Sequence, residues 1–361
     1  MHPTSDVYVA IMAGGVGSRF WPGSREHRPK QFLDILGVGK SLLRLTFERF
    51  LGLCPASNIF VVTNAAYTNL VAEQLPELAP HQILGEPSRN DTAPCIAYTA
   101  LKLSSLQPDA VLVVAPSDHV VLRPDVFLDL LRQAIAFASQ RDALLTLGIQ
   151  PTRPDTGYGY IQLGPAEEDH IFRVERFTEK PDAETARRFV DSGQYLWNAG
   201  IFIWSLPSIL RAFERLAPDI YQVLEKGRAF YHTPQETDFL QTHYPTTRKV
   251  PVDIAILEKA PNVFTLPADF GWSDLGTWAS LHQESEKDAN DNVVQSQTAL
   301  LYDVRDTFVR APQGKLLVLR GLHDYIVVDE NDVLLVWPKS EEQAIKQVRA
   351  DVQQRFGEAF L

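Results

Sequence analysis

The chain has 361 residues, which suits two domains of which one is large, because domains usually span roughly 100 to 200 residues. Hydrophobic residues make up 45% and charged residues 22%, a composition that excludes a disordered chain. The net charge is −11 and no apolar run reaches about 18 residues, so we expect no nucleic acid and no membrane as partners.

The N-terminus lacks a basic leader region, since Met1 to Asp6 lead directly into a strand-like run. We therefore expect a cytoplasmic protein. Only two cysteines occur, Cys54 and Cys95, too few for a disulfide framework or a thiolate metal site. We expect both to be packing residues.

Between residue 7 and about 150, short apolar runs alternate with longer amphipathic stretches, the pattern of βαβ units around a parallel sheet. The segments after Met12 and after Val114 should emerge at one edge of that sheet, where ligands of open α/β sheets bind. The predicted strands are Val7–Met12, Ile59–Val62, Ala110–Val114 and Ala143–Ile149, and the predicted helices lie near 41–51, 65–79, 92–106 and 125–139.

The pattern becomes less regular after residue 151, and a polar run at 284–292 then looks like a linker. We predict an α/β protein, with a Rossmann-like domain at 1–285 built on a central, mostly parallel sheet, and a small C-terminal β module at 286–361 with a terminal helix. Strand-like runs in these two regions are 159–163, 171–177, 198–204, 299–304, 315–320, 324–328 and 333–337, followed by a helix-compatible stretch at 340–356.

A glycine-rich loop directly follows the first predicted strand. It contains Gly14, Gly15 and Gly17, and two cations follow, Arg19 and then Lys30. Glycines let backbone N–H groups approach phosphate oxygens, and the two cations can neutralise a triphosphate. A tight turn between strand and helix is the structural alternative, but it does not account for the two cations.

Two commoner phosphate motifs fail at this loop. The dinucleotide fingerprint G-x-G-x-x-G would need glycine at position 20, which is Phe20. A P-loop ending at 39–41 would need glycine at position 34, which is Asp34, so we expect residues 39–41 to form a turn and a helix cap.

Three acidic positions are ambiguous when taken alone. Asp118 follows an apolar strand and fits a helix cap or a surface turn as well as a metal ligand. Asp274 fits the N-cap of a following helix, and Glu179 before Lys180 fits a solvated charge pair that ends a strand.

Taken together, the motifs resemble those of the sugar nucleotidyltransferases. The resemblance rests on the glycine loop, 29–30, 116–119, 177–181 and 270–274, which occur in order between residue 7 and about 283. It is strongest to the branch that transfers GMP from GTP to mannose 1-phosphate, which implies GDP-mannose and pyrophosphate as products. Longer relatives carry a fused phosphomannose isomerase half, which we do not expect in a chain of this length.

The resemblance also implies a role for each matching residue. The triphosphate would be held by Gly14, Gly15, Gly17, Ser18, Arg19 and Lys30, and the segment that faces the purine contains Glu86, Asn90 and Thr92. The catalytic set would be Arg19, Lys30, Asp118 and Asp274, of which the two aspartates share a Mg²⁺ ion. The sugar and its phosphate would be met by Gly159, Glu179, Lys180 and Asn198.

One departure from the family pattern keeps alternatives open. Arg89 is displaced by one position from the place where the family carries an arginine, so another base or sugar is the nearest rival. A catalytically silent homologue is the rival from another class, and the presence of all four predicted catalytic residues speaks against it. The strand edges of the C-terminal module suggest pairing between subunits in a homodimer.

Overall fold

The structure is a computed structural model that describes residues 6–168 and 170–361. The first five residues, which bear on the expected lack of a leader, lie outside the described residues. By their contacts the described residues form two compact units. The first takes in the residues up to Gly14 with Thr46–Ser117 and Val121–Trp272, and the second takes in Gly15–Leu45, Asp118–Val120 and Ser273–Leu361.

The second unit therefore groups most of the glycine loop with the C-terminal module. These units do not coincide with the predicted domains, and the predicted domain boundary near residue 285 stays a prediction. The chain passes between the units at several points, within α1 (Leu42–Phe50) and near the two-residue strands β5 (Val120–Val121) and β11 (Trp272–Ser273).

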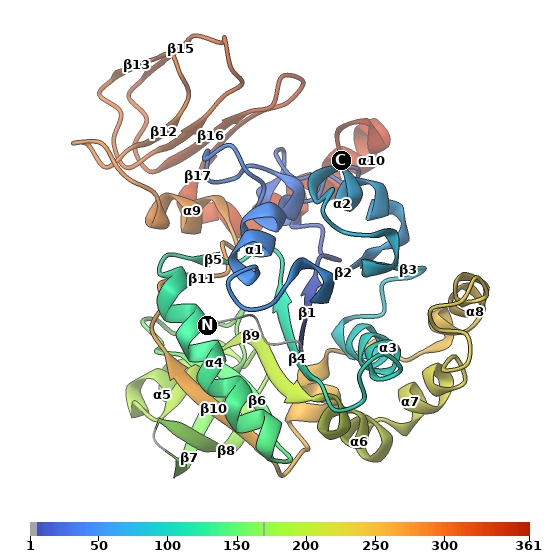
Figure 1. Cartoon of the computed structure of the whole chain (residues 1–361). Coiled ribbons are helices and arrows are strands. Elements are labelled where there is room, and N and C mark those ends of the chain that lie inside the picture. The colour runs from blue at the N-terminus through green and yellow to red at the C-terminus, as the bar shows by residue number, and fades with distance from the viewer. Residues whose placement is uncertain (1–5, 169) are drawn as a thin grey trace. The chain divides into compact units, whose positions relative to one another are not determined.

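A nine-stranded sheet forms the centre of the first unit, in the order β3-β2-β1-β4-β9-β6-β10-β8-β7 among the described residues (Figure 1). The ladders from β3 to β4 are parallel, β6 and β10 are also parallel, and β9 lies antiparallel between β4 and β6. The strands are β1 (Val7–Met12), β2 (Ile59–Asn64), β3 (Ile83–Glu86), β4 (Val111–Pro116), β6 (Leu144–Ile149), β7 (Tyr160–Glu168), β8 (Ile171–Thr178), β9 (Tyr195–Ser205) and β10 (Val263–Ala268). The predicted α/β class is confirmed.

The apolar run of β1 explains why its bounds were predictable. It lies between β2 and β4, and Val9 and Ala10, whose side chains point to opposite faces of the sheet, are both buried. A strand buried on both faces has a continuous apolar sequence and not an alternating one. The other three predicted strands of this half also form, with ends within two residues of the expected positions.

Local capping chemistry sets the ends of several helices in the first unit. α5 begins after Asp182, whose carboxylate accepts from Thr185 N at 2.7 Å, and ends at Gly193, whose φ is 67°. α4 begins with Pro124, a residue suited to the first helical position. The helices are α2 (Thr68–Gln74), α3 (Thr92–Ser104), α4 (Pro124–Gln140), α5 (Ala183–Ser192), α6 (Leu206–Leu216), α7 (Pro218–Glu225) and α8 (Glu236–His243).

The second unit contains a four-stranded sheet, β12-β14-β16-β17, and a two-stranded sheet, β13-β15. Its elements are β12 (Val293–Gln295), β13 (Ala299–Tyr302), β14 (Phe308–Arg310), β15 (Leu317–Arg320), β16 (Tyr325–Asp329), β17 (Leu334–Pro338), α9 (Trp278–Glu284) and α10 (Ile345–Phe356). Four of these strands overlap the predicted runs, whereas β12 and β14, with three residues each, were not predicted.

The core of the second unit joins the segment after the glycine loop to this β module. Phe20 lies edge-on to Trp278 with ring centroids 4.8 Å apart, and Trp278 also contacts Phe308 at 5.3 Å. The indole of Trp21 donates to the carbonyl of Phe360 at 2.8 Å. These contacts between residues far apart in sequence hold the loop segment on a packed support.

Candidate active site

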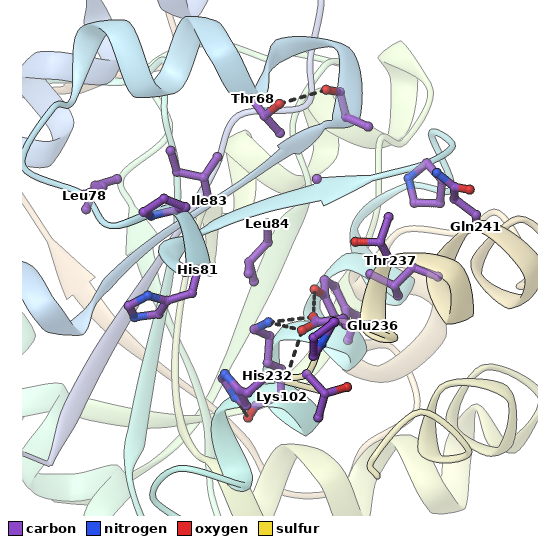
Figure 2. Close-up of a pocket in the computed structure, with 18 of the residues that line it drawn as sticks. Thr68, Leu78, His81, Ile83, Leu84, Lys102, His232, Glu236, Thr237 and Gln241 are labelled. Atoms are coloured by element: carbon purple, nitrogen blue, oxygen red, sulfur yellow. Dashed lines mark hydrogen bonds and ion pairs between the residues drawn. The ribbon is translucent and has the colours of Figure 1, made fainter. Parts of the chain in front are cut away.

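A pocket in the first unit is lined by residues other than the predicted ones, although its lining includes Gly85 and Pro87, on either side of Glu86. It is bordered by β3, α2, α3 and α8, and none of the predicted site residues is among the described residues that line it (Figure 2). Its charges are already paired, because Lys102 Nζ lies 2.5 and 2.6 Å from the carboxylate oxygens of Glu236. The backbone N–H of His232 also donates to Glu236, at 2.8 Å. This network satisfies the polar groups at the base of the pocket.

The glycine loop presents backbone donors. Among residues 6–168 and 170–361, the N–H groups of Gly14, Gly15, Val16 and Gly17 donate to no protein acceptor. Successive unpaired N–H groups in a turn suit the oxygens of an anion. Gly17 has a φ of 68°, and a Cβ there would lie 2.5 Å from Cβ of Lys30, so glycine is required by both conformation and space.

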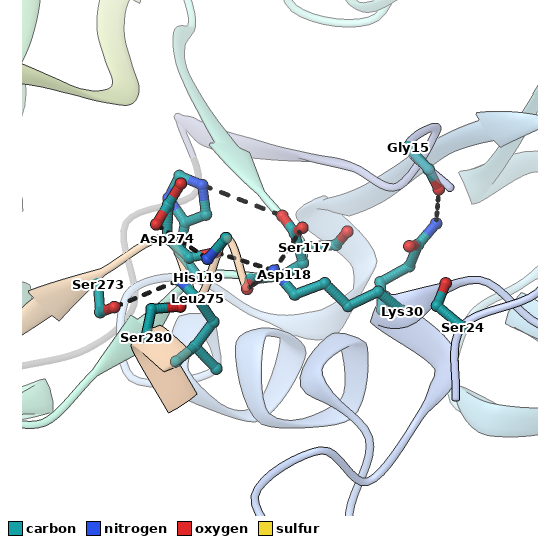
Figure 3. Close-up of polar contacts among 12 residues, drawn as sticks. Gly15, Ser24, Lys30, Ser117, Asp118, His119, Ser273, Asp274, Leu275 and Ser280 are labelled. Carbon is teal, nitrogen blue, oxygen red and sulfur yellow. Dashed lines mark hydrogen bonds and ion pairs between the residues drawn. The ribbon is translucent and has the colours of Figure 1, made fainter. Parts of the chain in front are cut away.

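Lys30 lies at the centre of the predicted catalytic set within the second unit (Figure 3). Its ammonium donates to Asp118 Oδ2 at 3.0 Å, to the carbonyl of Asp118 at 3.2 Å and to the carbonyl of Asp274 at 2.8 Å. The Lys30 side chain is 3% exposed. The structure therefore brings together the two predicted aspartates, from segments 156 positions apart (118 and 274), around one buried cation.

The surroundings of Asp118 favour its charged form. Burial is the largest effect and would raise the pKa of Asp118, but the charges of Lys30 and His119 and the hydrogen bond from Lys30 together outweigh it and hold that pKa below its usual value. Asp118 does not cap a helix, because the chain continues into β5. The cap alternative for this residue is wrong.

Asp274 does not cap α9 either. That helix is capped by Thr277, whose hydroxyl accepts from Ser280 N at 3.1 Å. Oδ1 of Asp274 accepts from Gly276 N at 3.1 Å, and a Cβ on Gly276 would lie 3.1 Å from both Asp274 Oδ2 and Arg19 Nη1. The carboxylate of Asp274 and the guanidinium of Arg19 thus lie on the same side of Gly276, and Arg19 joins the set.

The segment between Arg19 and Lys30 is braced by ion pairs of the second unit. Arg25 makes a bidentate pair with Asp332, with N–O distances of 2.6 and 2.7 Å, and donates to the carbonyl of Pro22 at 3.0 Å. Two parallel N–H···O bonds fix orientation as well as charge. Arg25 therefore holds the conformation of the segment that follows the glycine loop.

Glu86 lies level with Gly14, the glycine of the loop that belongs to the first unit. The parallel registers align Met12 with Val62 and Val62 with Leu84, which puts Glu86 opposite the position of Gly14. A Cβ on Gly14 would lie 3.8 Å from Glu86 Oε2. The register of three strands thus explains how residues 72 positions apart (14 and 86) meet.

Two donors hold the Glu86 carboxyl in place. Tyr244 donates its hydroxyl proton to Oε1, and Cys95 contributes a second hydrogen bond. Burial raises the pKa of Glu86 to about 7, although both hydrogen bonds lower it. Sequence reasoning missed Tyr244 and assigned Cys95 to packing alone, because neither position carries a local signal.

Glu86→Gln should stabilise the folded chain at pH 8. The pKa of Glu86 is about 7 when folded, against an ordinary 4.5, so the stability that it contributes is present below pH 4.5 and is lost as the pH rises through 7. Gln stays neutral and keeps an acceptor for Tyr244. We expect a gain on the order of 2 to 3 kcal/mol at pH 8 and little change at pH 4.5, measured by urea unfolding.

The control for this experiment is Glu73→Gln, an exposed glutamate on α2. It should leave the urea midpoint unchanged at both pH values. A gain for Glu86→Gln that is equal at pH 4.5 and pH 8 would contradict the assignment of a raised pKa to this residue.

Three residues of the following segment have structural partners. The amide of Asn90 donates to the carbonyls of Tyr244 and Thr247, both at 3.0 Å, and its oxygen accepts from Ser88. The Thr92 hydroxyl accepts from Val252 N at 2.9 Å, and Arg89 donates to the Tyr67 hydroxyl at 2.7 Å. These bonds shape the segment, and direct contacts of Asn90 and Thr92 with a nucleotide stay predictions.

The predicted sugar-binding residues converge in the first unit. Asn198 N donates to the carbonyl of Gly159 at 2.8 Å, and a Cβ on Gly159 would lie 2.6 Å from Glu179 Oε2. Glu179 pairs with Lys180 at 2.7 Å. The structure adds Asp253, whose Oδ1 accepts from Asn198 Nδ2 at 2.9 Å. Asn198 therefore contacts both Gly159 and Asp253, and Glu179 lies against Gly159 and pairs with Lys180.

The two aspartates of the second unit fit a hard divalent cation. Carboxylate oxygens are the ligands that Mg²⁺ prefers, and it usually takes one or two of them and completes its shell with water and phosphate oxygens. In the described part of the chain there is no group of three or more His, Cys, Asp or Glu residues that could hold a metal. Asp118 and Asp274 are the two acids whose segments meet at the Lys30 ammonium.

The fold and this site define a nucleotidyl transferase. The chain belongs to that family, whose pattern, described as "Nucleotidyl transferase", matches residues 8–291. Members of the family generally use a divalent metal. No helix of the described residues is long and apolar enough to cross a membrane.

Individual relatives are similar over most of the chain. A Salmonella muenchen protein named mannose-1-phosphate guanylyltransferase is 37% identical over 353 residues, which cover 95% of this chain and 73% of that protein. The xanthan biosynthesis protein XanB of Xanthomonas campestris is 36% identical over 353 residues, with 96% and 73% covered. A crystal structure from Thermus thermophilus, described as a mannose-1-phosphate geranyltransferase, has a TM-score of 0.87 at 31% identity, covering 96% of this chain and 99% of that one.

Proposed function

We propose that this chain transfers GMP from GTP to mannose 1-phosphate, forming GDP-mannose and pyrophosphate. The observation that carries the proposal is the meeting of Lys30, Asp118 and Asp274 in the unit that also holds the unpaired N–H groups of Gly15 to Gly17. Relatives named mannose-1-phosphate guanylyltransferase, similar over 95% of the chain, support this choice of sugar and base.

The reaction is an in-line displacement at phosphorus. A phosphate oxygen of mannose 1-phosphate attacks the α-phosphorus of GTP and forms a new P–O bond. The bond from the α-phosphorus to the oxygen that bridges to the β-phosphate breaks, and its electron pair leaves with pyrophosphate. Because the nucleophile is already anionic, the protein contributes alignment and charge neutralisation more than proton transfer.

Both the glycine loop and the cations Arg19 and Lys30 would bind the triphosphate. The N–H groups of Gly15 and Gly17 would bind phosphate oxygens, with Ser18 and Arg19 beside them. All three protons of the Lys30 ammonium already have acceptors, so a direct bond to phosphate requires Lys30 to exchange one of these. Its charge acts on the phosphates in either case.

Asp118 and Asp274 would hold a Mg²⁺ ion. The charge of Lys30 keeps the pKa of Asp118 low, so this ligand is ionised at neutral pH. Bound there, Mg²⁺ supplies positive charge against the phosphate oxygens. The choice of Mg²⁺ over other divalent ions is part of the proposal.

Recognition of base and sugar would fall to the first unit. Glu86 would accept N–H groups of the guanine, with its carboxylate oriented by Tyr244. Glu179, Lys180 and Asn198 would meet the sugar and its phosphate, around Gly159. Because an ionised Glu86 accepts only, it would favour a base edge that donates.

Gly159→Ala should weaken binding of the sugar phosphate without unfolding the chain. The new Cβ would lie 2.6 Å from Glu179 Oε2 and 3.3 Å from the ring of Phe177, so Glu179 has to move and Phe177 has to shift slightly, while the backbone need not. We expect the KM for mannose 1-phosphate to rise roughly tenfold, about 1.4 kcal/mol, with the KM for GTP little changed. Steady-state kinetics with each substrate varied in turn would test this.

Gly157→Ala is the matched control, because Gly157 is exposed and its Cβ would meet only the side chain of Asp155. Both KM values of this control should stay at those of the parent. Equal rises in both KM values for Gly159→Ala would instead indicate a general distortion of the first unit.

One experiment tests the function as a whole. Pyrophosphate release would be measured with GTP, UTP, ATP and dTTP, each combined with mannose 1-phosphate and with glucose 1-phosphate. We expect the highest kcat/KM for GTP with mannose 1-phosphate. A higher value for another pair would assign the chain to a sister transferase, and no release with any pair would support a silent homologue.

A cytoplasmic location and a homodimer complete the proposal as predictions. Neither follows from the geometry of the site. The oligomeric state would be measured by analytical ultracentrifugation.

A further inference from the structure

Asp253 is a buried acid that lies beside the predicted sugar-binding residues, which include the acid Glu179. It begins a short π-helix, η7 (Asp253–Leu257), and is 8% exposed. Short π-helical turns interrupt regular structure and occur often at functional sites. Burial, and next the charge of Glu179, raise the pKa of Asp253 to about 7. A buried acid beside another acid lowers the stability of the fold, and such acids are common at functional sites.

The hydrogen bonds of Asn198 fix how its amide is oriented. Oδ1 accepts from the hydroxyl of Thr146 at 2.8 Å and from Gly200 N at 3.2 Å. Gly200 N can only donate, so the amide oxygen and not the amide nitrogen faces it. Nδ2 then donates to Asp253 Oδ1 at 2.9 Å, so Asp253 supplies the acceptor that the NH₂ group needs.

Counting donors shows what is left for a ligand. An amide side chain has two acceptor sites and two N–H groups. The acceptor sites face Gly200 N and the Thr146 hydroxyl, whose single proton is shared with the carbonyl of Ile201, and Asp253 takes one N–H. One N–H of Asn198 remains for a further acceptor.

Asn198 also lies where the sheet is irregular. The register between β6 and β9 shifts between Thr146 and Gly148, and Gly148 pairs with Asn198. Such irregularities redirect side chains. The backbone of Asn198 donates to Gly159, the same glycine whose missing Cβ leaves room for Glu179. The amide and the Glu179 carboxylate therefore approach one small region of the first unit.

We infer that Asp253 is a positioning residue for the sugar: it holds the amide of Asn198 so that the remaining N–H is presented to a hydroxyl oxygen of the hexose phosphate. This inference rests on the proposed function and deepens it. It assigns Asp253 an effect on sugar affinity through Asn198, without contact between Asp253 and the reacting phosphates.

The test is a double-mutant cycle of Asp253→Ala and Asn198→Ala, with steady-state kinetics in both substrates. Asp253→Ala should raise the KM for mannose 1-phosphate roughly tenfold and change the KM for GTP less than twofold. The double variant should have the same KM for mannose 1-phosphate as Asn198→Ala alone, because Asp253 acts through Asn198. A merely structural residue would give additive losses in both substrates.

Two further variants make the test independent of folding. Asp253→Asn keeps an oxygen that can accept from Asn198 and should restore the KM for mannose 1-phosphate to within about threefold of the parent. Asp253→Leu removes the acceptor without leaving a void, and it replaces Asp253→Ala in the cycle if that variant does not fold. Asp191→Ala, an exposed acid on α5, is the control and should match the parent.

The outcomes separate this inference from the proposed function. Kinetics of the parent chain over the panel of sugar phosphates decide the function, and the cycle is then run with the sugar phosphate that the parent uses best. Additive losses in the cycle, or an Asp253→Asn variant as impaired as Asp253→Ala, would overturn the inference while leaving the function intact. If the parent releases no pyrophosphate with any pair, calorimetric binding of mannose 1-phosphate to the same variants decides the inference, and absence of binding to the parent overturns it.

Discussion

Lys30→Ala should lower the turnover number for pyrophosphate release on the order of 10²- to 10³-fold, because it removes a buried positive charge that, in the proposed function, acts on the triphosphate. Lys30 is 3% exposed and its ammonium is bonded to both aspartate segments. Without it the carboxylate of Asp118 loses its counter-charge, and two backbone carbonyls lose their donor. The loss should therefore appear mainly in kcat, with a smaller loss of stability.

Lys30→Met separates charge from packing. The ammonium of Lys30 lies over the ring of Phe20, 5.3 Å from its centroid, and an unbranched Met side chain fills much of the space of the buried Lys30 stem without the charge. We expect Met and Ala variants to lose turnover alike, while the Met variant unfolds at the higher temperature of the two. The measurements are pyrophosphate release at saturating substrates and thermal unfolding.

Lys40→Ala is the control for both Lys30 variants, since Lys40 is an exposed lysine of the same segment. Its turnover should equal that of the parent. Turnover within threefold of the parent for Lys30→Ala would show that the cation serves folding and not the reaction.

The first half of the sheet was predictable because its strands carry their own signal. β1 is apolar throughout and is buried on both faces, so its bounds follow from the sequence. β3 (Ile83–Glu86) has four residues, one of them Gly85, and lies at the edge of the sheet, which leaves almost no pattern to detect. The antiparallel position of β9 between β4 and β6 depends on pairings across the chain that no local pattern encodes.

The acids of the site illustrate the same limit. From local sequence alone, Asp118 and Asp274 could be helix caps or metal ligands. Only the resemblance to the family predicts that the two share one metal ion. Tertiary structure removes the cap alternative, because Thr277 caps α9 and the chain after Asp118 forms a strand.

Asp253 has a signal of its own in the sequence. It stands within the run Val252 to Leu257, in which all other residues are apolar, and a lone acid in such a run is unusual. Its contact with Asn198 spans 55 positions (198 to 253), so the partner could not be found from spacing. A buried acid is thus detectable from sequence, whereas its function needs the fold.

Asp274→Ala should lower turnover on the order of 10²- to 10³-fold and raise the Mg²⁺ concentration needed for half-maximal rate. The variant is informative because it removes only the carboxylate: Lys30 bonds to the backbone carbonyl of Asp274, which alanine keeps, and Thr277 still caps α9. We therefore expect a melting temperature close to that of the parent, measured beside pyrophosphate release over a range of Mg²⁺ concentrations. Asp351→Ala, an exposed acid on α10, should behave as the parent in both assays. Parental turnover and an unchanged Mg²⁺ dependence in Asp274→Ala would exclude this carboxylate as a metal ligand, since a site with two protein ligands cannot lose one of them without a change in affinity.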